Sequence, residues 1–176
     1  QSPSDIGIPV NTSRRRLTGA GLGMSAVFTL ASRPVLAATC LSASAAASGN
    51  MSHHGAAPVC TGKTANFWAD NCTLKEKFNK IFAKGRFADW GSMKFPQVLK
   101  ATDNSNIAPM PNPISREFAA ALLNVRAGYI PTTVLTELKL IGMWHEWVEG
   151  GTFSPTVGAS WDAAQIVTYL RGLQSY

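Results

Sequence analysis

Charged side chains are scarce in this sequence. Only 15% of its 176 residues are Asp, Glu, Lys or Arg, whereas 45% are hydrophobic. No stretch approaches the roughly 20 apolar residues that a membrane-spanning helix needs, which excludes a polytopic membrane protein. Glycine and proline, with 15 and 10 residues, have ordinary abundance, which excludes collagen-like and wholly disordered chains. The length suits one domain with tails.

Familiar catalytic and cofactor motifs are also missing. The sequence has no Walker loop, no GxGxxG, GxSxG or HExxH pattern, no CxxCH haem attachment and no EF-hand loop. We therefore expect a non-catalytic protein without a bound cofactor. The remaining candidate for an enzyme of unfamiliar type is His145, which lies between Trp144 and Trp147 and has the chemistry of a general base. No nucleophile or carboxylate pair is placed to work with it.

Positive charge exceeds negative charge, but unevenly along the chain. The formal net charge is +6. Residues 63–100 contain eight basic and three acidic residues, a net +5, whereas residues 101–176 contain four basic and six acidic residues, a net −2. The four remaining basic residues all lie in the first 37 residues, so we expect no nucleic-acid partner. Oppositely charged halves can steer self-association or meet an anionic surface, although a solvated helix face is the simpler interpretation.

Residues 1–37 have the organisation of an export signal. A basic start precedes sixteen uncharged residues, 17–32, and a small-residue ending at Ala37. The segment Ser13-Arg14-Arg15-Arg16-Leu17 resembles a bacterial twin-arginine (Tat) signal, with Leu17 where phenylalanine is commonest. The resemblance implies a protein that folds in the cytoplasm and is then exported, to the periplasmic side of the cytoplasmic membrane or to the cell surface.

The fate of this segment has three interpretations. Cleavage after Ala37 would release the rest of the chain. Retention would leave a short single-span membrane anchor, with Arg14, Arg15 and Arg16 on the cytoplasmic side and with Gly19 and Gly23 on a face suited to close helix packing. A lipoprotein, modified at Cys40, is the third interpretation.

Three cysteines, Cys40, Cys60 and Cys72, allow at most one disulfide within the chain. We expect the pair Cys40–Cys60, which closes a flexible loop rich in Ala, Ser and Gly, with Cys60–Cys72 as the alternative. Such a bond persists in the oxidising surroundings of exported proteins. His53 and His54 near Cys60 form a weak candidate set for a soft metal ion. The set lacks the spacing of a metal site, so we assign no metal.

The amino-acid composition divides the sequence into three parts. Residues 1–37 are the signal or anchor, residues 38–59 form a flexible tether rich in Ala, Ser and Gly, and residues 60–176 form a globular domain. Apolar periodicity and capping residues predict helices in the globular part, and no segment is typical of a strand. The expected helices cover 73–85, 95–101, 114–126, a range from Thr132 or Thr133 to 149, and a range from a Ser160 cap to 173. The fold class is therefore mainly α, a small irregular helical bundle preceded by the anchor helix and the tether.

Tryptophan is the other notable feature, with five residues in the chain. The segment Asn66-Phe67-Trp68-Ala69-Asp70-Asn71 resembles a divergent form of a Gly-Tyr-Trp-Lys-Asn-His segment found in uncharacterised exported bacterial proteins. That resemblance implies no known activity and no site residues. We expect Trp144 and Trp147 to lie at a protein interface, where tryptophan is enriched.

Together these features favour a non-catalytic, exported structural or accessory subunit of a membrane-associated or extracellular assembly. Its partners would be other protein subunits, and the membrane if the N-terminal segment is uncleaved. The alternative is a soluble periplasmic protein that binds a ligand or a metal ion.

Overall fold

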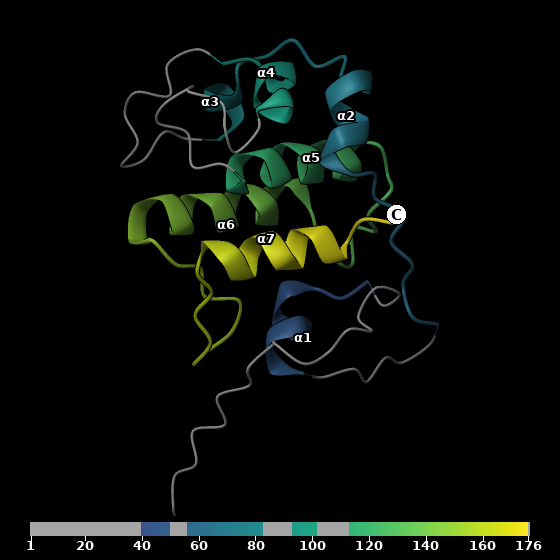
Figure 1. The fold of residues 1–176 in the computed structure, drawn as a ribbon. Helices are drawn as coiled ribbons and strands as arrows, with labels where there is room; N and C mark the ends of the chain where they lie inside the picture. Colours follow the sequence, from purple (N-terminus) through teal and green to yellow (C-terminus); the bar gives the residue numbers. More distant parts are fainter. Residues whose placement is uncertain (1–39, 50–55, 83–92, 102–112, 176) are drawn as a thin grey trace, which may run out of the picture. The chain divides into compact units, whose positions relative to one another are not determined.

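The computed structural model describes residues 40–49, 56–82, 93–101 and 113–175. Within these ranges the chain forms seven helices (Figure 1): α1 (Ala43–Ser48), α2 (Ala65–Asn71), α3 (Phe78–Ile81), α4 (Phe95–Lys100), α5 (Ile114–Arg126), α6 (Glu137–Gly150) and α7 (Ala163–Gly172). Backbone pairing in the same ranges is limited to three isolated bridges. The mainly α class is thus confirmed for the described chain. The predicted signal or anchor, residues 1–37, lies outside it.

None of the helices in the described ranges combines the length and the apolar character needed to cross a bilayer.

Helix α5 is the central element of the bundle. It contacts α2 and α4, and it also contacts α6 and α7, which lie below it in Figure 1. Three successive small residues, Ala119, Ala120 and Ala121, are at most 1% exposed, so neighbouring helices approach it closely on several sides. The predicted bounds of this helix, residues 114–126, agree with the structure.

An aromatic cluster fills the space between α3, α5 and α6. The fully buried Trp144 lies at its centre. Its ring centroid is 5.3 Å from that of Phe78, 5.4 Å from Phe82 and 4.9 Å from Phe118. Several of these contacts are edge-to-face, the geometry that the ring quadrupoles favour. The cluster therefore holds the short helix α3 against the two long helices.

The helix predicted over residues 73–85 is wrong in its first half, since α3 covers only Phe78–Ile81. The preceding residues run alongside the start of α4 instead. The Phe78 N–H donates to the Met93 carbonyl at 2.9 Å, and the Phe95 N–H donates to the Glu76 carbonyl at 3.3 Å. This pairing brings the rings of Phe78 and Phe95 to 5.4 Å in the core. Burial of two aromatic rings outweighs the local capping signal that predicted a longer helix.

Two helices begin later than predicted. The N–H groups of Val134 and Leu135 both donate to the Pro131 carbonyl, at 2.9 and 3.1 Å, so a turn occupies the expected start of α6. The helix starts only after Thr136, whose hydroxyl accepts from the Lys139 N–H at 3.2 Å. Helix α7 is capped by Asp162 rather than by Ser160. In both cases a nearby side chain satisfies the free N–H groups of the first turn better than the predicted cap.

The expected flexible tether over residues 38–59 contains a helix. Ser42 caps α1, and Gly49, with φ of 64°, ends it in the left-handed region. The first described residues, Cys40 and Leu41, are only 2% and 6% exposed. The Tyr169 hydroxyl on α7 donates to the Leu41 carbonyl at 3.2 Å. Residues 40–49 therefore belong to the domain, because a disulfide and the core hold them in place.

Candidate functional site

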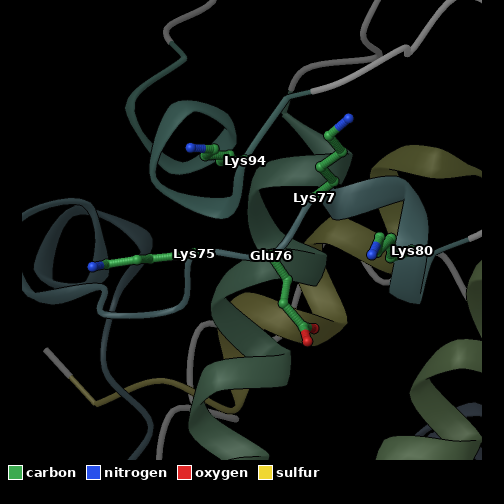
Figure 2. A pocket seen from close by; sticks show the side chains of 5 residues that line it. All are labelled: Lys75, Glu76, Lys77, Lys80 and Lys94. Atoms are coloured by element: carbon green, nitrogen blue, oxygen red, sulfur yellow. The ribbon is translucent and has the colours of Figure 1, made fainter.

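A shallow depression on the surface is lined mostly by lysine. It has a volume of about 370 Å³, and its lining residues are Lys75, Glu76, Lys77, Lys80 and Lys94 (Figure 2). The backbone bridge between Lys77 and Lys94 creates it, because the bridge brings two segments 17 residues apart into register. All five side chains are exposed.

The lysines of this depression are not neutralised by the described part of the chain. The ion pairs there are Arg126–Glu137 and Arg171–Glu117, and neither involves a lysine of the depression. In Figure 2 the lysine side chains fan out in different directions, and the Glu76 carboxylate points away from Lys77. Among the described residues of the lining, four lysines and one glutamate give a net charge of +3. Because the ammonium groups do not converge, the geometry suits an extended acidic surface better than a single small anion.

Helix α5 carries a buried side-chain amide, that of Asn124. Asn124 is 0% exposed. Its Oδ1 accepts from the Lys63 N–H at 2.7 Å and from the Trp68 indole N–H at 2.9 Å, and its Nδ2 donates to the Lys63 carbonyl at 2.8 Å. These bonds attach the start of α2 to α5. The polar groups of this side chain are therefore engaged in structure rather than directed at a ligand.

The C-terminal segment is attached at the same place. The Ser175 N–H donates to the Gly62 carbonyl at 2.7 Å, next to a parallel bridge between Gly62 and Gln174. A Cβ atom at Gly62 would lie 2.5 Å from the Leu173 carbonyl oxygen. Only glycine lets the two backbones approach this closely.

Glu117 makes a second buried polar link from α5. It lies seven residues before Asn124, so both side chains project from the same face of the helix. Glu117 is 3% exposed, and its carboxylate accepts from the Arg171 Nε and from the Gln174 Nε2, each at 2.8 Å. The two side chains together tie the segment that leads into α2 and the segment around residues 171–174 to α5.

The segment 66–71, which resembles a segment of other exported proteins, forms most of α2. The Lys63 ammonium group lies 5.8 Å from the Phe67 ring centroid and 5.6 Å from the Tyr129 ring centroid. These are cation–π distances. The Lys63 ammonium group therefore lies over both rings.

The structure places Trp144 and Trp147 in the core, with exposed fractions of 0% and 3%. Neither indole is therefore exposed for the predicted protein interface, because the aromatic cluster between the helices encloses both rings. His145, between them on α6, is half-buried. Among the described residues no group of three or more His, Cys, Asp or Glu side chains is arranged to hold a metal ion.

Cys40 and Cys60 form the expected disulfide, with Cα atoms 5.2 Å apart. Cys60 therefore has no free thiolate to offer to a metal ion. The other two residues of the weak metal set, His53 and His54, lie outside the described residues, as do Arg14, Arg15, Arg16, Gly19 and Gly23. Cys72 is a free, half-buried thiol. Burial raises its pKa, which a hydrogen bond with the backbone of Leu74 partly offsets, so the thiol is not activated.

Sequence analysis did not single out Asn124 or Glu117. Both are polar residues inside a predicted amphipathic helix, and their spacing of seven residues puts them on one face. That spacing was the available signal. Their partners at residues 63, 68, 171 and 174 are distant in sequence, so the links themselves were not predictable.

Comparison of this chain with protein-family models, with curated proteins and with solved structures gave no match.

Proposed function

We propose that this protein is a non-catalytic, exported structural or accessory subunit of a membrane-associated or extracellular assembly, held there by its N-terminal segment. The observation that carries the proposal is the use of the buried polar side chains of α5. Asn124 and Glu117 use their side-chain polar atoms to bind the segments around residues 62 and 174. Such links stabilise a domain whose task is to be a rigid part of something larger.

The disulfide supports the exported location. Cys40–Cys60 joins residues 20 positions apart and ties the beginning of the domain to the segment before α2. Such bonds persist in oxidising compartments and are rare in the cytosol. The bond is therefore compatible with a protein that works outside the cytoplasm.

The position of Cys40 bears on how the domain would be held. Only two residues, Ala38 and Thr39, lie between Ala37, the end of the predicted signal or anchor, and the buried Cys40. The three residue steps from Ala37 to Cys40 span at most roughly 10 Å. An uncleaved N-terminal segment would therefore hold the domain close to the membrane with little slack. The lysine-lined depression, on the layer of α3 and α4, remains free to meet another component.

The test is fractionation of the native cells followed by mild detergent extraction. We expect the chain in the membrane or surface fraction and in a complex larger than its own mass. Recovery as a free monomer that begins at Ala38 in the soluble periplasmic fraction would remove the case for anchoring and for a subunit.

A further inference from the structure

The loop between α6 and α7 projects from the domain and is flanked by negative charge, whereas the lysine-lined depression is positive. Residues 140–170 contain no Lys or Arg, but they contain the exposed carboxylates of Glu146, Glu149 and Asp162. At the tip of the loop Val157 is fully exposed. Figure 1 shows this loop below α6 and α7, whereas α3 and α4 lie above α5.

Backbone pairing holds the loop in shape. The N–H groups of Phe153 and Trp161 each donate to the carbonyl of the other, at 2.9 and 2.7 Å. The Glu146 carboxylate accepts from the Ser154 N–H at 2.7 Å. A preorganised loop loses little conformational entropy on docking. The exposed Val157 and the carboxylates at the ends of the loop therefore form a preorganised binding element.

We propose that this loop docks into the lysine-lined depression of a second copy of the same chain. The proposal rests on the proposed function, because it makes the assembly partly a polymer of this subunit. Three carboxylates at the base of the loop meet a depression with a net charge of +3, and the apolar stems of the lysines can contact Val157. Charge complementarity of this kind speeds and orients association.

The symmetry of this contact follows from where its two halves lie. The loop and the depression are different surfaces, so one copy uses its loop while offering its depression to another copy. Such a head-to-tail contact forms chains or rings rather than a closed twofold dimer. A nucleic-acid strand is a poorer occupant, because the described residues that line the depression include no aromatic side chain to stack on bases.

The first experiment is sedimentation velocity of the full chain over a range of concentrations. At about 0.05 M salt we expect reversible oligomers larger than dimers, and at about 0.5 M salt we expect them to weaken, because the Debye length shrinks. A monomer at all concentrations in low salt, or oligomers insensitive to salt, would overturn the proposal.

Two charge-reversed variants locate the contact. Lys77→Glu/Lys80→Glu reverses part of the depression, and Glu149→Lys/Thr152→Lys reverses the base of the loop without removing the Glu146–Ser154 bond. Each variant alone should bind itself at least about tenfold more weakly than the unaltered chain. An equimolar mixture should associate again, since the intact loop of the first variant fits the intact depression of the second. Lys139→Glu, an exposed lysine on α6 outside both surfaces, is the matched control and should leave association unchanged.

Other outcomes identify other occupants. Self-association that survives both reversals, or a mixture that stays monomeric, overturns the docking of loop into depression. Salt-sensitive binding of the chain to vesicles of anionic phospholipid, lost in Lys77→Glu/Lys80→Glu while the chain stays monomeric, would assign the depression to a membrane and reject the second copy. The fractionation experiment remains separate, because a chain that does not self-associate can still be found in a complex with other proteins.

Discussion

The indole N–H of Trp68 donates to Oδ1 of Asn124 at 2.9 Å, across 56 positions of sequence. The same oxygen accepts from the backbone of Lys63, so one buried amide orients α2 and the segment that leads into it. This relationship holds Trp68, in the segment 66–71, against α5. It also makes Asn124 a residue whose loss should destabilise the fold.

Replacement of Asn124 by alanine should destabilise the domain by about 3 kcal/mol, because the Trp68 indole and both Lys63 backbone groups lose buried partners. The free energy of unfolding, from urea titration followed by tryptophan fluorescence, measures the effect. Asn71→Ala, an exposed asparagine at the end of α2, is the control and should cost less than about 1 kcal/mol. Equal losses in the two variants would show that the buried amide has no special role.

Two glycines provide a second matched comparison. Gly62→Ala should destabilise the domain by about 1–3 kcal/mol, since the new methyl group would clash with the Leu173 carbonyl and displace the C-terminal segment. Gly142→Ala, within α6, meets no atom within 4 Å and should instead stabilise by about 0.5–1 kcal/mol. Thermal unfolding of both variants measures the two shifts, which should have opposite signs. A stabilised Gly62→Ala variant would contradict the close approach at this position.

The disulfide should contribute to stability because it restricts the unfolded chain. Cys40→Ser/Cys60→Ser opens a bridge with a sequence separation of 20, which corresponds to about 3 kcal/mol. Urea unfolding without reductant measures the loss, and hydrogen exchange should show α1 losing protection first. Cys72→Ser should change stability by less than about 1 kcal/mol. A disulfide variant as stable as the unaltered chain would argue against α1 as a part of the domain.

Tyr169 should make stability depend on pH in the alkaline range. Burial raises the pKa of its hydroxyl above the ordinary value of 10.0. Above that pH the unfolded chain loses the proton first, so the free energy of unfolding should fall as pH rises further. Tyr169→Phe should cost about 1 kcal/mol at neutral pH, through loss of the bond to the Leu41 carbonyl, and should make the alkaline decline shallower. Tyr129→Phe retains Tyr169 and should keep the full decline; equal pH profiles for the two variants would refute this assignment.

Local signals predicted the helices that local interactions determine. The apolar stripe of residues 114–126 and the proline near the start of α4 were enough to locate α5 and α4. The pairing of Cys40 with Cys60 was also predictable, since the chain offers few cysteines. The only sequence signal for the depression was the net positive charge of residues 63–100.

Contacts between distant segments account for what was missed. The pairing of residues 76–78 with 93–95 replaced half of a predicted helix, and nothing within either segment indicates the other. Small residues predict flexibility over 38–59, whereas in residues 40–49 the disulfide and the bond from Tyr169 attach the chain to the domain. The burial of Trp144 depends on four other aromatic rings brought together by three helices.

The most direct test of the proposed function is the intact mass, without reduction, of the protein isolated from its native cells together with the size of the particle that contains it. The account predicts a chain that still includes residues 14–37, carries one disulfide and no lipid, and sediments in a complex larger than one copy. A mass that begins at Ala38, from a particle the size of a single chain, would contradict it.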